Sequence, residues 1–214
     1  SNGSGNGNGN GNGNSSGRPP PLIMWLQGGN GCSSLTGCLG EQGPFFATKD
    51  GGLARNAQGW HRLPAHMLYV DRPAGAGFSW SAAPPVRGSP DNFANDAQTA
   101  RDSLAFLRGF LAQHPWLCEA DGRQIWVAGE SYAGHFTIQL ATLIAEAEAG
   151  GDALCLPLGG VLSGNSVVNI NETNYAWFEA GYTHSLVSED TWRGLQAQCN
   201  FSIDLGVDGN NCPC

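Results

Sequence analysis

Four short apolar runs, each ending in a loop of small or polar residues, constrain the fold more than any other feature of the chain. They span residues 22–26, 67–70, 125–128 and 160–162. Continuous apolar runs of this length are typical of strands in a sheet, and we expect the first to be buried on both faces. Helical spans separate the runs, so the order of elements predicts an α/β fold with a central, mostly parallel sheet.

Three helices are predicted between and after these strands. Residues 91–113 and 132–148 carry apolar side chains at spacings of three and four, and residues 173–183 are rich in aromatic side chains. The predicted apolar stripes contain Phe93, Ala97, Ala100, Leu104, Leu107 and Leu111 in the first helix and Ile138, Leu140, Leu143 and Ile144 in the second. Parallel strands joined by helices place their functional loops at one edge of the sheet, where the strands end.

The amino-terminal residues 1–17 contain only Ser, Asn and Gly, and we expect them to be disordered because they have no large side chains to bury. Residues 18–214 are expected to form the folded part. The net charge is −8 and no basic run offsets it, so a nucleic-acid partner is not expected. No apolar run approaches the ~18 residues of a membrane-spanning helix, so no membrane partner is expected either.

Seven cysteines and four Asn-x-Ser/Thr sequences indicate a secreted glycoprotein with disulfides. The four acceptor residues are Asn2, Asn14, Asn171 and Asn200. An odd number of cysteines leaves one without a partner within the chain. There is no Cys-x2-Cys pair, and Cys212 and Cys214 are too close to bridge each other, so we expect neither a metal site nor a cofactor.

The segment Gly129-Glu130-Ser131-Tyr132-Ala133-Gly134 follows the third predicted strand and begins the second long helix. A sharp strand-to-helix turn of this kind, with small residues two before and two after the serine, is a nucleophile elbow. It raises the serine hydroxyl above the sheet at a helix N-terminus, where developing negative charge is stabilised. The pattern predicts that Ser131 is the nucleophile of an acyl-transfer site.

Acyl transfer also needs two backbone N–H groups directed at the oxyanion. One is expected from Tyr132, the residue after the nucleophile, and the other from the Gly28-Gly29-Asn30-Gly31 loop after the first strand. The alternative interpretation is that both glycine segments are only tight turns.

Four segments together closely resemble the serine carboxypeptidase family, in the family's order. They are residues 21–35, 41–45, 69–80 and 129–135, and the likeness continues through residues 160–165 and 177–199. The resemblance covers about residues 20–214, the amino-terminal half of that fold. It implies a truncated α/β-hydrolase fold in which residues 171–200 begin a helical cap.

The resemblance also assigns roles to site residues. It implies that Ser131 is the nucleophile, that the N–H groups of Gly29 and Tyr132 form the oxyanion hole, and that a carboxylate-binding network holds the end of the substrate. That network would contain Gln27, Glu41 and Glu130. A carboxyl group donates to a carboxylate only while it is protonated, which requires a raised pKa or an acidic medium, so an acidic working pH is expected. The family usually has Asn in place of Gln27 and Pro in place of Asn30.

The family's catalytic Asp and His follow the nucleophile in a carboxyl-terminal half that this chain lacks. We assign no general base, because the five histidines match no catalytic motif and are interpreted as surface or packing residues. They are His61, His66, His114, His135 and His184. The resemblance also implies that Cys32 pairs beyond this chain and that Cys199 pairs with Cys212 or Cys214; it offers no counterpart for Cys38, Cys118 or Cys155.

The function that these features predict is that of a serine-type carboxypeptidase, which removes carboxyl-terminal residues from peptide substrates through an acyl-enzyme. One alternative is a carboxypeptidase-like acyltransferase, which passes the acyl group of a sugar ester to an alcohol. The other is a non-catalytic fragment that lacks the triad Asp and His. The expected location is the secretory pathway, with a vacuolar, lysosomal or extracellular destination, and the oligomeric state is left open.

Overall fold

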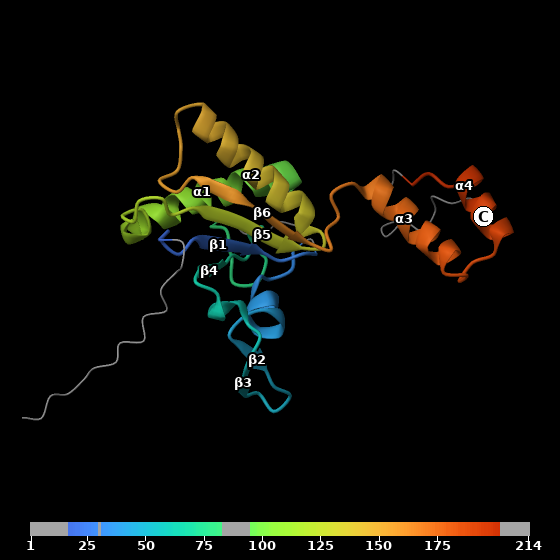
Figure 1. Cartoon of the computed structure of the whole chain (residues 1–214), viewed down its shortest axis with the longest axis horizontal. Coiled ribbons are helices and arrows are strands. Elements are labelled where there is room, and N and C mark those ends of the chain that lie inside the picture. Colours follow the sequence, from blue (N-terminus) through green and yellow to red (C-terminus); the bar gives the residue numbers. More distant parts are fainter. Residues whose placement is uncertain (1–16, 30, 83–94, 202–214) are drawn as a thin grey trace, which may run out of the picture.

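The computed structural model describes residues 17–29, 31–82 and 95–201, and its centre is a four-stranded parallel sheet (Figure 1). The strand order is β4-β1-β5-β6. The strands are β1 (Leu22–Leu26), β4 (His66–Tyr69), β5 (Ile125–Glu130) and β6 (Leu158–Gly164). The predicted α/β fold with a parallel sheet is therefore confirmed.

The four strands end at a common edge. Trp25 of β1 lies opposite Tyr69 of β4, and Leu26 lies opposite Gly129 of β5. Glu130 in turn lies opposite Gly164 at the end of β6. The loops that leave the four strands consequently meet at one edge of the sheet, as expected for parallel strands.

The strands differ in burial according to their place in the sheet. Every residue of β1 is buried, because β1 has a neighbour on each side and layers on both faces. Within the described residues, β4 and β6 are the outer strands; β4 is half-buried, and the last three residues of β6 are exposed. The predicted bounds are right for β1 and differ by one or two residues at the ends of the others, where the strands include polar residues or glycine such as His66, Gly129 and Ser163.

One face of the sheet is covered by two long helices, α1 (Asp96–Gln113) and α2 (Ala133–Ala149) (Figure 1). The main core lies between these helices and the sheet. It includes the fully buried Met24, Leu26, Leu107, Ile125, Val127, Leu140 and Ile144. Burial of this apolar surface, at roughly 25 cal/mol per Å², is the main force holding the layers together.

The start of α1 and the buried face of α2 differ from the sequence prediction. α1 begins at Asp96, where the Asn95 side chain caps the helix by accepting from the Gln98 N–H; residues 91–94, including Phe93, lie outside the described residues. Ala97 is exposed. Ile138, predicted to be in the buried stripe of α2, is 45% exposed. Small residues bring α2 close to the sheet, so its buried face is Ala133, Gly134, Phe136, Thr137, Leu140, Ala141 and Ile144.

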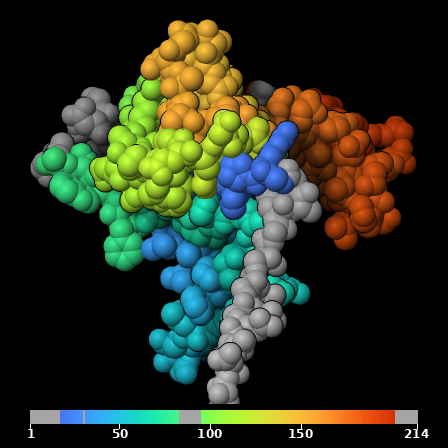
Figure 2. Space-filling view, turned by 60° about the vertical axis from the view of Figure 1, so that its left-hand side comes forward, coloured from blue at the N-terminus to red at the C-terminus, as the bar shows by residue number. Residues whose placement is uncertain are grey.

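The other face of the sheet carries short elements that have no counterpart in the prediction. They are the short helices η1 (Gly37–Glu41) and η2 (Trp60–Arg62) and a hairpin of β2 (Phe45–Ala47) and β3 (Leu53–Arg55). Figure 2 shows the hairpin projecting from the body of the molecule. A second, smaller apolar cluster, containing Ile23, Trp25 and Ala128, lies on this face.

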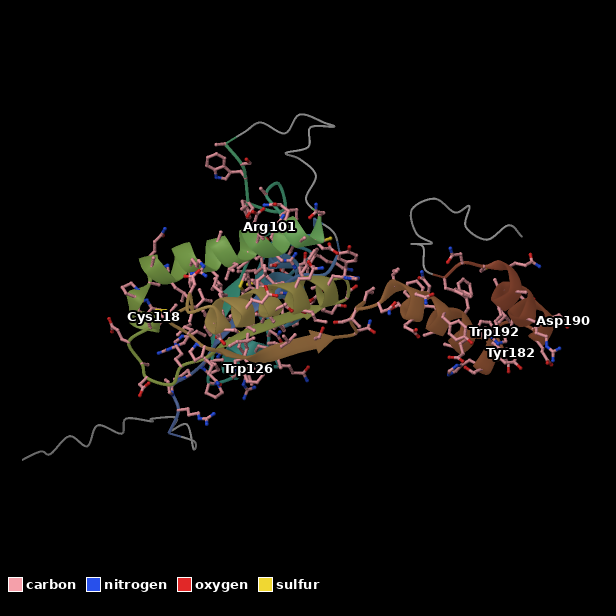
Figure 3. All side chains as sticks on the ribbon, turned by 90° about the horizontal axis from the view of Figure 1, so that it is seen from above. Arg101, Cys118, Trp126, Tyr182, Asp190 and Trp192 are labelled. Atoms are coloured by element: carbon pink, nitrogen blue, oxygen red, sulfur yellow. A yellow bond between two sulfur atoms is a disulfide. The ribbon has the colours of Figure 1, made fainter. Side chains whose placement is uncertain are left out.

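The carboxyl-terminal helices α3 (Ile170–Thr183) and α4 (Glu189–Gln198) form a separate lobe beyond the end of β6 (Figures 1 and 3). Aromatic contacts hold the lobe together: Trp192 stacks on Tyr182 with centroids 5.9 Å apart and meets Tyr175 edge-on at 5.3 Å. α3 begins three residues before the predicted helix, because Asn169 caps its first turn. The lobe corresponds to the predicted start of a helical cap.

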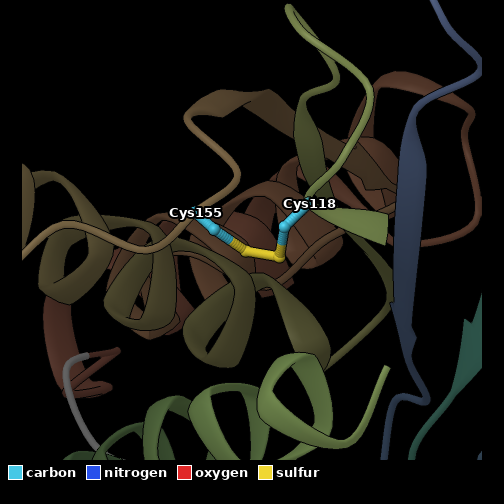
Figure 4. Close-up of a disulfide and its surroundings, with 2 residues drawn as sticks. All are labelled: Cys118 and Cys155. Carbon is cyan, nitrogen blue, oxygen red and sulfur yellow. A yellow bond between two sulfur atoms is a disulfide. The ribbon is translucent and has the colours of Figure 1, made fainter. Parts of the chain in front are cut away.

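A disulfide joins Cys118, which follows η4 (Pro115–Leu117), to Cys155 in the loop before β6 (Figure 4). Sequence analysis left both cysteines without partners. Cys199 is also disulfide-bonded, whereas its predicted partners Cys212 and Cys214 lie outside the described residues. Cys32 and Cys38 are free thiols in the part of the chain that the structure describes.

Several sequence predictions fall on segments that are not described. The segment 1–17 is described only at Gly17, and the acceptor residues Asn2 and Asn14 lie outside the described ranges. Asn171 and Asn200 are described and exposed. No helix within the described ranges combines the length and the apolar character needed to cross a membrane.

Candidate active site

Ser131 occupies the sharp turn between β5 and α2 with a left-handed backbone, φ +60°. A non-glycine residue in this region is strained by roughly 1–3 kcal/mol and persists where surrounding contacts fix it. Here the Ser131 N–H donates to the Gly164 carbonyl at 3.1 Å, and the Ser131 carbonyl accepts from the Val167 N–H at 2.9 Å. The end of β6 and the loop that follows it thus hold the turn in its strained form.

Small residues around the turn are required by close backbone contacts. A Cβ atom at Gly129 would lie 2.7 Å from both the Ala133 Cβ and the Leu26 carbonyl oxygen. A Cβ atom at Gly134 would lie 2.5 Å from the Val167 carbonyl oxygen. Both distances are too short for real atoms, so glycine at these two positions lets the chain fold back on itself.

The glycine loop after β1 lies directly beside Ser131. A Cβ atom at Gly28 would meet the Glu130 carbonyl oxygen and would lie 2.7 Å from the Ser131 Cβ. Gly29 follows with φ +75°, and the adjacent Asn30 lies outside the described residues. The Ser131 side chain is half-buried, so the turn leaves it partly accessible above the sheet. The structure therefore brings Ser131 against the backbone of Gly28, and Gly29 follows directly in the same loop.

Two of the three residues predicted to bind a carboxylate are in contact. The Gln27 Nε2 donates to the Glu41 carboxylate at 3.2 Å, and the Gln27 Oε1 accepts from the Trp25 indole at 2.9 Å. Gln27 is buried, whereas Glu41 is exposed. Glu130 is half-buried at the end of β5, and no hydrogen bond among the described residues joins its side chain to Gln27 or Glu41.

A carboxylate that sequence analysis did not select ties the loops after β1 and β4 together. Asp71 accepts from the Ser33 hydroxyl at 2.6 Å, the Ser34 N–H at 2.7 Å and the Phe78 N–H at 2.9 Å. Partial burial by itself raises the pKa of Asp71, but these hydrogen bonds, together with one involving the Leu35 backbone, lower it below its ordinary value. Asp71 is thus held as a carboxylate under the edge of the glycine loop.

Sequence analysis also assigned no role to Arg72, although the Asp71-Arg72-Pro73 sequence directly follows the second predicted strand. Its side chain is buried, with 7% of its surface exposed. Burial lowers the pKa of Arg72 to about 9, and the charge of Asp96 acts in the opposite direction. Arg72 therefore keeps its charge at neutral and acidic pH.

The five histidines make contacts other than with the serine hydroxyl, as far as the described residues show. His135 comes nearest to a carboxylate, with its Nδ1 3.9 Å from Asp96, and His184 bonds the Ala180 carbonyl. In the described part of the chain no histidine hydrogen-bonds to Ser131. The same residues contain no group of three or more His, Cys, Asp or Glu side chains that could hold a metal ion.

A parallel sheet that carries a strained serine between strand and helix, with a glycine loop against it, defines the α/β-hydrolase class. The comparisons with known proteins are more specific. Residues 12–213 match the family model described as serine carboxypeptidase, and the chain belongs to that family.

Individual relatives and a solved structure support this assignment. The chain is 36% identical over 197 residues to serine carboxypeptidase-like 32 of Arabidopsis thaliana, covering 90% of this chain and 41% of the relative. It is 39% identical over 191 residues to serine carboxypeptidase-like 40 of the same plant, covering 86% and 35%. It also resembles the crystal structure of Kex1(delta)p, a prohormone-processing carboxypeptidase from Saccharomyces cerevisiae. That comparison gives a TM-score of 0.69 and 26% identity, and covers 89% of this chain and 41% of the other. The chain thus spans about two fifths of the length of these proteins.

Proposed function

We propose that this chain is the nucleophile-bearing part of a serine carboxypeptidase that removes carboxyl-terminal residues from peptides. The observation that carries the proposal is the position of Ser131, strained at φ +60° and lying against the backbone of Gly28. A serine held in this way presents its hydroxyl next to backbone N–H groups, as the attack on a carbonyl group requires.

In the proposed reaction the Ser131 Oγ attacks the last peptide carbonyl of the substrate. The resulting oxyanion is stabilised by the N–H groups of Gly29 and Tyr132. Collapse of the tetrahedral intermediate breaks the peptide bond, releases the carboxyl-terminal residue as the amine product and leaves an acyl-serine, which water then hydrolyses. The proton transfers need a base, which the resemblance to the family assigns to an Asp and His pair beyond this chain.

The proposed substrate-binding network contains Gln27, Glu41 and Glu130. Gln27 offers an amide N–H to the substrate carboxylate, and it is oriented by its bonds to Trp25 and Glu41. The two Glu side chains donate to a carboxylate only while protonated, so binding of the substrate is expected to be favoured in an acidic medium.

The location belongs to the same proposal. The disulfide between Cys118 and Cys155 fits a protein that folds in an oxidising compartment. We propose passage through the secretory pathway to a vacuolar, lysosomal or extracellular destination. The exposed Asn171 and Asn200 are the proposed glycosylation sites among the described residues.

The test is a direct comparison of two reactions in the full-length protein, with Ser131→Ala as the control. Release of amino acids from peptides with a free carboxyl terminus is measured beside transfer of the acyl group from an acyl-glucose ester to an alcohol. Peptide hydrolysis that disappears with Ser131→Ala and with carboxyl-amidated peptides supports the proposal. Transfer without hydrolysis would identify an acyltransferase, and neither reaction would indicate a non-catalytic chain.

A further inference from the structure

A buried arginine joins the glycine loop to the helix that begins at the elbow. The Arg72 Nη2 donates to the Gln27 carbonyl oxygen at 3.2 Å, on the residue directly before Gly28. The Arg72 Cζ lies 3.7 Å from the centroid of the Phe136 ring, on the buried face of α2. The Arg72 guanidinium group therefore contacts both the start of the glycine loop and the first turn of α2, which lie far apart in the sequence.

Asp96 extends this connection to Tyr132. The Tyr132 hydroxyl donates to the Asp96 carboxylate, with oxygen distances of 3.2 and 3.3 Å. Asp96 is also the charged group that acts on Arg72, where it favours the cationic form. His135 lies at the edge of the same cluster, 3.9 Å from Asp96. Asp96 thus contacts the Tyr132 side chain directly and acts on Arg72 through its charge.

The two proposed oxyanion donors come from loops after different strands, and their relative position must be fixed to a fraction of an ångström. We propose that Arg72 and Asp96 are positioning residues that hold the Gly29 and Tyr132 N–H groups in register across the site. Arg72 fixes the glycine loop through the Gln27 carbonyl, and Asp96 fixes the elbow through the Tyr132 hydroxyl. This inference rests on the proposed function, because the proposed function assigns the role of oxyanion donors to the two N–H groups.

The molecule contains a matched control for Arg72. Arg123 is equally buried, with 7% of its surface exposed, and it also pairs a backbone carbonyl with an aromatic ring. It donates to the Pro20 carbonyl at 3.1 Å and lies 5.8 Å from the Trp116 ring centroid. The Nε atoms of both arginines are buried without a partner among the described residues. Arg123 precedes β5, however, and so lies at the opposite edge of the sheet from Ser131.

The kinetic test compares Arg72→Met with Arg123→Met in the full-length protein. Misplaced oxyanion donors weaken transition-state binding more than substrate binding. We therefore expect Arg72→Met to lower kcat by about 10- to 100-fold with KM changed less than about threefold. Arg123→Met should leave kcat within about twofold of wild type. Arg72→Lys, which keeps the charge and one donor, should recover part of kcat. Asp96→Asn should lower kcat less and should add little to Arg72→Met, because either change misaligns the same pair of N–H groups.

Hydrogen exchange provides a readout that does not depend on activity. Arg72→Met should accelerate amide exchange at Gln27 and Ser131, whose N–H groups donate to the Ser34 hydroxyl and the Gly164 carbonyl, whereas Arg123→Met should not. The inference is wrong if both arginine variants lower kcat equally, or if Arg72→Met leaves exchange at these amides unchanged. If Ser131→Ala is as active as wild type, the proposed function is contradicted. Hydrogen exchange alone would then decide whether Arg72 positions the loop and the elbow.

Discussion

Gly28 and Ser131, which are 103 positions apart in the sequence, are in such close contact that no side chain fits between them. A methyl group on Gly28 would lie 2.7 Å from the Ser131 Cβ and would also meet the Glu130 carbonyl oxygen. The contact joins the end of β1 to the end of β5, which are neighbours in the sheet. It places the predicted oxyanion loop against the predicted nucleophile.

Gly28→Ala should therefore damage both the fold and the site. We expect the free energy of unfolding to fall by roughly 1–3 kcal/mol, because the obstacle is backbone that cannot move easily. Gly109→Ala is the control: Gly109 lies within α1 with nothing within 4 Å of its added Cβ. That substitution should stabilise the protein by about 0.5–1 kcal/mol. Urea denaturation of both variants measures the difference, and equal effects would contradict the contact.

The positive φ of Ser131 predicts an order of stability among variants at this position. Ser131→Val should lower the free energy of unfolding by roughly 1–3 kcal/mol, because a β-branched side chain is poorly tolerated at φ +60°. Ser131→Gly should change it by less than about 1 kcal/mol, since glycine adopts this conformation freely. Thermal unfolding of the two variants beside wild type measures the order. A valine variant as stable as the glycine variant would show that the turn is not strained.

Asp71 should make the protein less stable in strong acid. Its pKa is lowered in the folded state by hydrogen bonds, against a value of about 3.9 in an unfolded chain. A carboxylate of this kind stabilises the fold above the unfolded pKa, and the contribution is lost as the pH falls through the folded pKa. Asp71→Asn should therefore be less stable than wild type at pH 5 and 7, and the gap should narrow below about pH 4. A gap that stays constant down to pH 2 would exclude this role.

The Cys118–Cys155 disulfide should contribute substantially to stability. It closes a loop with a sequence separation of 37 residues. The chain-entropy relation for a loop of that length gives roughly 4 kcal/mol. We expect the Cys118→Ser, Cys155→Ser double variant to unfold at a clearly lower temperature, while Cys38→Ser, which removes a thiol that is free among the described residues, unfolds close to the wild-type temperature. Calorimetry measures both, and matching melting temperatures for the double variant and wild type would refute the expectation.

The central strands could be predicted from the sequence because their environment imposes one pattern. β1 is buried along its whole length, so Leu22–Leu26 is continuously apolar and its bounds were predicted to the residue. The β2–β3 hairpin was missed because all six of its residues are exposed and leave no such pattern. In α2 the buried face includes alanine, glycine and threonine, which are hard to distinguish from exposed residues in the sequence. Ile138 was therefore predicted on the buried face, although it is exposed.

The candidate site was predictable where chemistry depends on local sequence. The elbow around Ser131 needs glycine and alanine at fixed positions, and these can be read from the sequence. Arg72 and Asp96 could not be selected, because their partners Gln27 and Tyr132 lie far away in sequence. The Cys118–Cys155 pairing was missed for the same reason: seven cysteines allow many connectivities, and only the fold selects one.

The most direct test of the central claim is covalent labelling of the full-length protein with a fluorophosphonate, followed by intact-mass measurement and peptide mapping. We predict a single adduct on Ser131, which is absent from Ser131→Ala and from protein unfolded in urea. Ser163 near the end of β6 and Ser166 in the loop after it, whose hydroxyls lie 2.5 Å apart, serve as nearby internal controls that should stay unmodified. Labelling of those serines in place of Ser131, or an unlabelled folded protein, would contradict the assignment of Ser131 as the nucleophile.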